Sequence, residues 1–174
     1  MNKLRIFISS VQSEFVKERQ ILYDYVNTDA LLGRFFEAFI FEQLPATSIR
    51  ASKAYPDKVK KSDIYLGIFG KDYGHEDKEG ISPTEREYDL ATSGNKIRLI
   101  FISSHKDEER NSKELRLIKK AEDAVVRKRF NDAADLKVSV YAALIQVLED
   151  KELIRSDPFD ATVYKDATLD DIDP

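Results

Sequence analysis

The side chain best suited to chemistry lies in the segment Ser82–Tyr88, which reads Ser-Pro-Thr-Glu-Arg-Glu-Tyr. Four residues in and after it follow i, i+3, i+4, i+7 spacing and would share one helix face: Thr84, Glu87, Tyr88 and Ala91. This face turns inward if Tyr88 and Ala91 are buried, and Glu87 turns with it. A partly buried carboxylate can act as a nucleophile or stabilise an oxocarbenium ion, as carboxylates do in glycosidic bond cleavage. The alternative is a solvated Glu87 that interacts with the helix dipole.

The same segment carries a signal for the start of a helix. Ser82 with Glu85 three residues later is a capping box, and Pro83 falls at the first helical position. We therefore expect a helix over Pro83–Ser93 with Gly94 at its end. Glu85 is assigned a structural capping role in this helix rather than a catalytic one.

A ligand site beside this helix would be completed by the ends of neighbouring strands. In open parallel sheets, ligands bind at the carboxyl ends of strands where the strand order reverses. We expect seven residues to bind the ligand beside the candidate catalytic residue Glu87. They are Ser9, Ser10, Phe69, Gly70, Tyr73, Ser82 and Tyr88. Ser9 and Ser10 equally suit N-capping of the helix that follows them. Arg19 lies one turn after Phe15 and could neutralise a ligand or Glu18, but its position better suits a side chain that extends its charge into solvent.

The elements that position these residues alternate between strand and helix. Apolar runs predict strands at Leu4–Ser9, Phe35–Phe41, Asp63–Gly70, Ile97–Ser103 and, as a short edge strand, Val125–Phe130. Helical spacing predicts helices from Val11, over Ile49–Ser62 with Pro56 at the start of its regular part, and over Lys113–Val126 and Leu136–Leu153. The alternation predicts an α/β fold. We expect a three-layer, flavodoxin-like α/β/α sandwich with a mainly parallel five-stranded sheet of order 2-1-3-4-5.

Composition excludes several classes of function. The 174 residues contain no cysteine, and the two histidines have no metal-binding spacing, so we expect no metal site. The phosphate-binding GxxxxGK[ST] loop, the dinucleotide GxGxxG and the GxSxG elbow are absent, and no cofactor is expected. A net charge of −4 argues against direct nucleic-acid binding. The basic residues between Arg110 and Arg129 alternate with acids, which indicates a solvated helix face.

The two ends of the sequence set the expected domain organisation. The apolar run Leu4–Ile8 is interrupted by Arg5 and is too short for a signal peptide or a membrane span, so we expect a cytoplasmic protein without membrane contact. Residues 1–155 form the expected domain. The acid-rich segment Ser156–Pro174 is interpreted as a linker to a further domain of a longer protein.

Four ordered motifs within residues 3–104 carry a family resemblance: IFISS-V-x-S-E-F-x-x-E-R-x-x-L, KKSDIYLGIFGKDYG, SPTEREYDLA and KIRLIFI. This set resembles the TIR-like domain of unknown function 4062. The resemblance implies a relation to TIR domains and nucleoside deoxyribosyltransferases, in which a Glu four residues before an Ala cleaves or exchanges an N-glycosidic bond. Glu87, four residues before Ala91, matches it. The Gly-Tyr pair of the transferases is absent, with Tyr88-Asp89 here. The resemblance also implies a place ahead of an AlbA-like ATP-binding domain.

Two functional hypotheses follow from these residues and from the resemblance. In the first, a TIR-like domain of a signalling or defence regulator handles a nucleotide or NAD-like ligand. If active, it works through Glu87 as an NAD glycohydrolase or a nucleoside N-glycosidase or transferase. In the second, the domain is a non-catalytic sensing or self-association module that controls a downstream ATP- or DNA-binding domain. A fold alone does not decide between them, because one fold hosts many functions.

Overall fold

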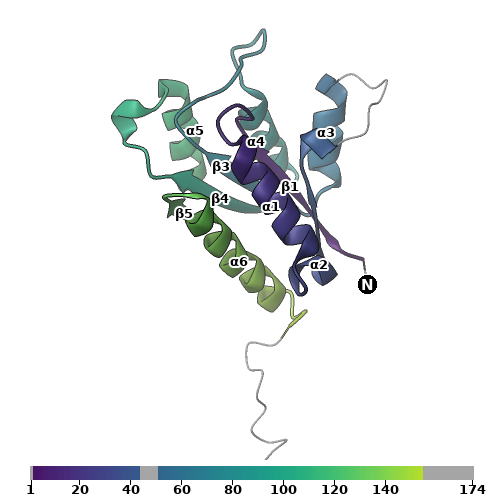
Figure 1. The fold of residues 1–174 in the computed structure, drawn as a ribbon. Helices are drawn as coiled ribbons and strands as arrows, with labels where there is room; N and C mark the ends of the chain where they lie inside the picture. The colour runs from purple at the N-terminus through teal and green to yellow at the C-terminus, as the bar shows by residue number, and fades with distance from the viewer. Residues whose placement is uncertain (1, 44–50, 155–174) are drawn as a thin grey trace, which may run out of the picture. The chain divides into compact units, whose positions relative to one another are not determined.

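The computed structural model describes residues 2–43 and 51–154. One parallel sheet of order β2-β1-β3-β4-β5 forms its centre (Figure 1). The five strands are β1 (Leu4–Ser10), β2 (Phe36–Phe39), β3 (Ile64–Phe69), β4 (Ile97–Ser103) and β5 (Arg127–Phe130). The α/β class, the parallel direction and the predicted strand order are therefore confirmed.

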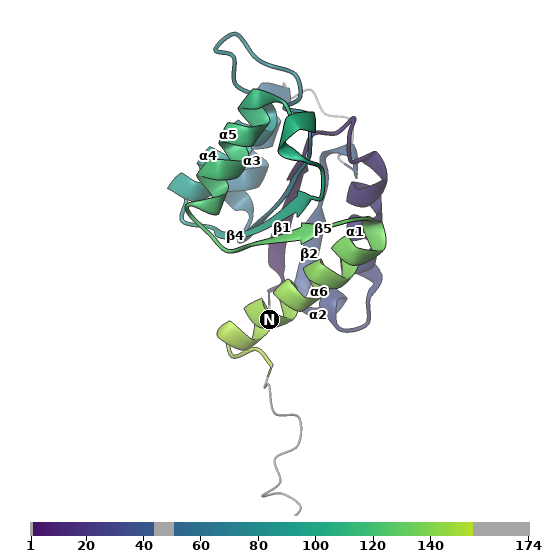
Figure 2. The ribbon, with the colours of Figure 1, turned by 90° about the vertical axis from the view of Figure 1, so that its left-hand side faces the viewer.

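Helices cover both faces of the sheet. The helices are α1 (Val16–Thr28), α2 (Leu32–Phe35), α3 (Ala51–Lys61), α4 (Pro83–Ser93), α5 (Ser112–Glu122) and α6 (Ala133–Asp150), with 3-10 turns η1 (Phe41–Gln43) and η2 (Asp107–Glu109). Helices α3, α4 and α5 lie on one face, and α1 and α2 lie on the other (Figure 2). In the described part of the chain, no helix is long and apolar enough to cross a membrane.

The core beneath α3, α4 and α5 shows why these sequences form these elements. Alternate strand residues point to the same face, and on this face they meet the apolar stripes of the three helices. The cluster consists of Phe7, Tyr65, Phe69, Ile100 and Ile102 from the strands, and Val59, Tyr88, Ala91, Leu117, Ile118 and Ala121 from the helices. Tyr88 and Ala91 are both almost fully buried, so the inner stripe of α4 faces the sheet, as its spacing predicts.

Two compact units divide the chain within α6. The first ends at Val140 and contains the whole sheet. The second begins at Tyr141, and its described part is the rest of α6 and the turn after it, through residue 154. The predicted linker, Ser156–Pro174, lies outside the described residues.

The helix after β1 starts later than its apolar pattern predicts. Residues Val11–Phe15 form a turn in which the Val11 carbonyl accepts the N–H groups of Glu14 and Phe15, both at 3.2 Å. Helix α1 begins at Val16, and Phe15 at its N-cap provides no side-chain hydrogen bond. The capping role considered for Ser9 and Ser10 is therefore wrong, because this turn separates them from the helix.

Two other boundaries differ from the sequence prediction. The second strand is only Phe36–Phe39, since Leu32–Phe35 makes the short helix α2 and residue 41 opens a 3-10 turn. Pro56 lies inside α3 rather than at the start of its regular part. Both errors arise where a run of apolar or helix-forming residues gives no local signal for where an element begins.

The start of α4 is built by three side chains. Ser82 Oγ accepts the Glu85 N–H at 3.3 Å, which is one half of the predicted capping box. The other half is different, because the Tyr73 hydroxyl accepts the Ser82 N–H at 3.2 Å and itself donates to the Glu85 carboxylate. Tyr73 thus bridges the two groups that a capping box joins directly, and it ties the preceding loop to α4.

We expect Tyr73→Phe to lower the free energy of unfolding by about 1–3 kcal/mol, because the buried Ser82 N–H loses its acceptor. Urea unfolding followed by circular dichroism measures this change. Tyr23→Phe is the control, since its hydroxyl lies on α1, away from this bridge, and should change stability little. Equal stabilities of the two variants would contradict the bridging role.

Candidate functional site

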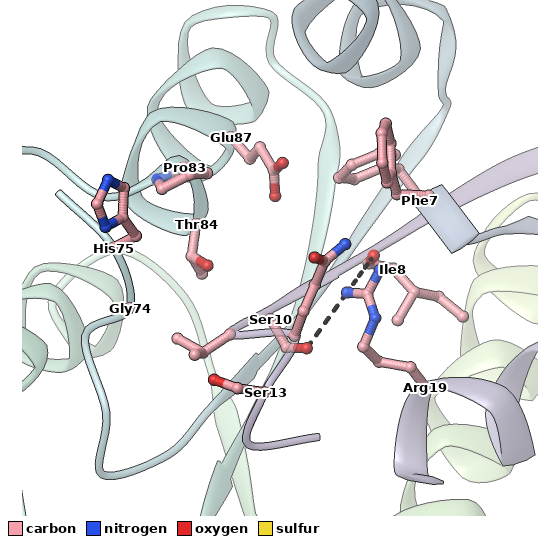
Figure 3. A pocket seen from close by; sticks show the side chains of 13 residues that line it. Phe7, Ile8, Ser10, Ser13, Arg19, Gly74, His75, Pro83, Thr84 and Glu87 are labelled. Atoms are coloured by element: carbon pink, nitrogen blue, oxygen red, sulfur yellow. Dashed lines mark hydrogen bonds between the residues drawn. The ribbon is translucent and has the colours of Figure 1, made fainter. Parts of the chain in front are cut away.

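A cavity of about 260 Å³ opens at the carboxyl end of β1. Its wall comes from β1 and the turn after it, from α1, from η1, from the loop before α4 and from the first turns of α4 (Figure 3). The lining residues are Phe7, Ile8, Ser10, Val11, Gln12, Ser13, Arg19, Phe41, Gly74, His75, Pro83, Thr84 and Glu87. The cavity therefore lies at the sheet edge where parallel α/β folds bind ligands.

Glu87 presents a buried carboxylate to this cavity (Figure 3). Glu87 is only 6% exposed, and Ser9 Oγ donates a hydrogen bond to Glu87 Oε2 at 2.5 Å. Burial raises the pKa of Glu87 to about 7, although the Ser9 hydrogen bond and the positive charge of Arg19 favour the ionised form. Near neutral pH the carboxyl group can therefore occupy either protonation state.

Arg19 forms the opposite wall and is fully engaged with neighbouring groups. Its Nε and Nη2 each donate to a Glu42 oxygen at 2.8 Å, and its Nη1 lies 3.2 Å from both the Ile8 carbonyl and Ser10 Oγ. Arg19 is 3% exposed, so the prediction that its charge extends into solvent is wrong. Burial opposes ionisation of Glu42, but hydrogen bonds from Arg19 hold the Glu42 pKa below its usual value.

Ser9 and Ser10 have different surroundings. Ser10 lines the cavity and accepts a hydrogen bond from Arg19, whereas Ser9 is completely buried and contacts Glu87. Ser9 thus orients the candidate carboxylate rather than lining the cavity itself. Among the other polar wall residues, Gln12 and Ser13 lie in the turn after β1, Thr84 shares the inner stripe of α4, and His75 comes from the loop before α4. The sequence did not predict any of these four as a ligand contact, although Thr84 shares the predicted helix stripe with Glu87.

Besides Ser9, five residues predicted to bind ligand do not line this cavity. Phe69 and Tyr88 pack edge to face in the core, with ring centroids 6.2 Å apart. Tyr73 and Ser82 build the start of α4. Gly70 is held at the end of β3 by other charged side chains. The structure therefore brings together Ser10 and Glu87, with Ser9 behind them, and leaves the other five outside.

Three charged side chains close the carboxyl end of β3, which explains the position of Gly70. Its N–H donates to Glu114 Oε1 at 3.2 Å, and its carbonyl accepts from Arg110. Glu14 accepts the next two backbone N–H groups, those of Lys71 and Asp72, at 2.8 and 3.1 Å. A ligand at the switch point therefore meets the end of β1 and not the end of β3.

Arg110 and Glu114 correct the interpretation of the charged segment as a solvated face. Arg110 is buried and also donates to the carbonyls of Ser103 and His105, at 2.5 and 2.9 Å. Glu114 is 1% exposed, and burial raises its pKa to about 8. Its Oε2 has no hydrogen-bond partner. Glu114 is thus a second buried carboxyl group, remote from the cavity lining.

The described residues contain no group of three or more His, Cys, Asp or Glu side chains placed to hold a metal ion. Any chemistry that these residues perform at the cavity would rest on the Glu87 carboxylate, the hydroxyl groups of Ser10, Ser13 and Thr84, the Gln12 amide and the imidazole of His75.

Comparisons with known proteins found solved structures of similar fold and one protein-family model that matches the sequence. The structure of Clostridium botulinum CMP N-glycosidase, BcmB, is similar with a TM-score of 0.53 at 13% identity, covering 80% of this chain and 98% of that chain. The TIR domains of the activated Roq1 resistosome, which recognises the pathogen effector XopQ, give a TM-score of 0.47 at 15% identity, with 83% of each chain covered. Residues 5–145 match the model described as "Domain of unknown function (DUF4062)". No curated protein matches the sequence. At 13% identity, the likeness to BcmB shows the fold alone.

We expect Ser9→Ala to raise the pKa of Glu87 further above 7, because the variant loses a hydrogen bond that favours the ionised carboxylate. Carbon-13 NMR titration of the glutamate side-chain carboxyl groups measures this pKa. Ser13→Ala is the control, since Ser13 lines the cavity without contacting Glu87 in the structure. A Glu87 pKa that falls or stays constant in Ser9→Ala would contradict the assignment.

Glu114 should make the protein less stable as pH rises. Its pKa is about 8 in the folded protein and near 4.5 when unfolded. The unfolded chain therefore releases this proton first, and stability present below pH 4.5 is lost as pH rises toward 8. We expect Glu114→Gln to flatten that decrease, which urea unfolding between pH 5 and 8.5 measures. An unchanged slope would show that Glu114 ionises normally.

Proposed function

This chain belongs to the DUF4062 domain family, and we propose that it cleaves the N-glycosidic bond of a nucleotide or NAD-like molecule through Glu87. One observation carries the proposal: a carboxylate that is 6% exposed, held by Ser9 and turned toward a cavity at the carboxyl end of β1. A buried carboxylate with a raised pKa in a cavity is the arrangement in which catalytic groups are commonly found.

The reaction places positive charge where this cavity can stabilise it. As the bond between the anomeric carbon and the base nitrogen breaks, its electron pair leaves with the base, and the ribosyl group becomes an oxocarbenium ion. Ionised Glu87, which is 6% exposed, stabilises that cation electrostatically. Water then adds to the anomeric carbon, and the proton that it loses goes to the departing base, or to solvent where the base leaves uncharged, as nicotinamide does. Because Ser9 holds Oε2, Oε1 is the oxygen that faces the sugar.

The comparison of folds supports the choice of reaction to test first. The protein BcmB, which is similar in fold, is described as a CMP N-glycosidase. Since a shared fold does not transfer an activity, the proposal depends on Glu87 and its surroundings. The predicted regulatory role and the place ahead of an AlbA-like ATP-binding domain remain predictions.

A second candidate function is ligand sensing without turnover. It is favoured by the pKa of Glu87, because at a value of about 7 much of the carboxyl group is protonated at neutral pH and is then a weak stabiliser of a cation. In this case the same cavity binds the ligand, and a change in assembly or in another domain is the output. The two functions differ in whether the base is released.

We expect Glu87→Gln to lower the rate of base release by on the order of 100-fold or more, as removal of a well-placed catalytic group does. Purified protein would be incubated with CMP, other nucleoside 5′-monophosphates, nucleosides and NAD, and the free base measured by liquid chromatography. The reaction should be faster above pH 7, where Glu87 is ionised in the folded protein.

Glu114→Gln is the matched control for this experiment. It removes another buried carboxyl group with a raised pKa, but one that does not line the cavity, so base release should persist. Equal loss of activity in both variants would assign the effect to folding rather than chemistry. Base release that persists in Glu87→Gln would remove Glu87 from catalysis, and binding without base release in the wild type would support sensing.

A further inference from the structure

A second cavity of about 330 Å³ lies next to the first. It is lined by Arg5 and Phe7 of β1, Glu37 and Phe39 of β2, and Lys58 and Lys61 of α3, among others. We call these six residues the Lys58 groove. Phe7 lines both cavities, so the two share one aromatic wall.

The groove carries an excess of positive charge. The Lys58 ammonium nitrogen lies 4.1 Å from the centroid of the Phe39 ring, and no carboxylate of the described residues pairs with Lys58 or Lys61. Arg5 contacts Glu37 at 3.8 Å, but both side chains are more than half exposed, so solvent weakens this pair. Three cations and one carboxylate therefore face the groove.

The cavity at Glu87, in contrast, has no uncompensated positive charge among its lining arginine and lysine side chains. Its one arginine, Arg19, already bonds both oxygens of Glu42 and two further acceptors. Of the lining residues, Arg19 alone carries a permanent positive charge, and Glu42 compensates that charge. A phosphate placed there would meet the Glu87 carboxylate without a free cation to offset the repulsion. The cavity suits an uncharged sugar and base.

We propose that the Lys58 groove is an anion subsite that holds the phosphate or diphosphate of the ligand whose ribosyl group lies at Glu87. The inference rests on the proposed function and specifies its substrate class: nucleotides rather than nucleosides. The phosphate binds Lys58 and Lys61 in the cavity that shares Phe7 with the Glu87 cavity, and their ammonium groups form charge-assisted hydrogen bonds with phosphate oxygens. The carboxylate of Glu87 and the lysines of the Lys58 groove thus lie in different cavities, which keeps the reacting glycosidic bond apart from the phosphate.

The test compares nucleotide–nucleoside pairs in binding and does not require turnover. Calorimetric titration would use CMP against cytidine, and NAD against nicotinamide riboside, with inorganic pyrophosphate as a separate probe. We expect the wild type to bind each nucleotide at least about tenfold more tightly than its nucleoside. The double variant Lys58→Glu/Lys61→Glu should lose that preference and leave nucleoside binding unchanged. Raising the salt concentration should weaken only the nucleotide complexes.

Lys60→Glu is the matched control. Lys60 lies beside Lys61 on α3 and is exposed, but its side chain does not line the groove, so the variant has the same change in charge as Lys61→Glu. We expect it to keep the preference for nucleotides. Similar loss in Lys60→Glu and Lys61→Glu would overturn the subsite in favour of a diffuse surface potential.

The remaining outcomes separate this inference from the proposed function. Equal binding of nucleotide and nucleoside, or no binding of either, overturns the subsite. Pyrophosphate binding as tight as that of nucleotides also overturns it, since the groove would then be an isolated anion site. Nucleotide binding that depends on Lys58 and Lys61 without base release supports the subsite while contradicting the glycosidase. Base release with equal kcat/KM for nucleosides and nucleotides supports the glycosidase and contradicts the subsite.

Discussion

The hydrogen bond between the Ser9 hydroxyl and the Glu87 carboxylate is the interaction on which the site depends. Burying a carboxylate costs several kcal/mol unless other groups replace its hydration, and Ser9 on β1 supplies one replacement at 2.5 Å. Tyr88 and Ala91 pack the same helix face into the core, so Glu87 is turned inward with them. The partial compensation leaves a carboxyl group with a pKa of about 7 beside a cavity.

The position of the cavity follows from what closes the neighbouring strand. Three side chains, Glu14, Arg110 and Glu114, bind the backbone at and after Gly70. Their hydrogen bonds replace the solvent or ligand that would otherwise satisfy the end of β3. The ligand edge of the sheet is thereby restricted to the end of β1 and the start of α4.

In the proposed reaction, the distribution of charge at this edge favours a transient cation. The Arg19 charge is compensated by Glu42, so under the proposal the ionised Glu87 carboxylate would supply the net charge near the reacting carbon. A cavity with this balance interacts more strongly with an oxocarbenium ion than with an uncharged sugar, which is the difference that catalysis requires. The free cations of the Lys58 groove lie beyond Phe7, where they can bind an anion without opposing that difference.

Sequence patterns alone predicted the sheet and its strand order, and they placed Glu87 on the same helix face as Tyr88 and Ala91. Apolar runs, helical spacing and the Ser82 cap are local signals, and short connections with right-handed crossovers leave few ways to arrange them. Which polar groups contact one another became visible only in the folded chain. Arg19 and Glu42 are 23 residues apart, and Gly70 and Glu114 are 44 apart. Such partners carry no mutual signal in the sequence, because burial and hydrogen bonding depend on which elements the fold brings together.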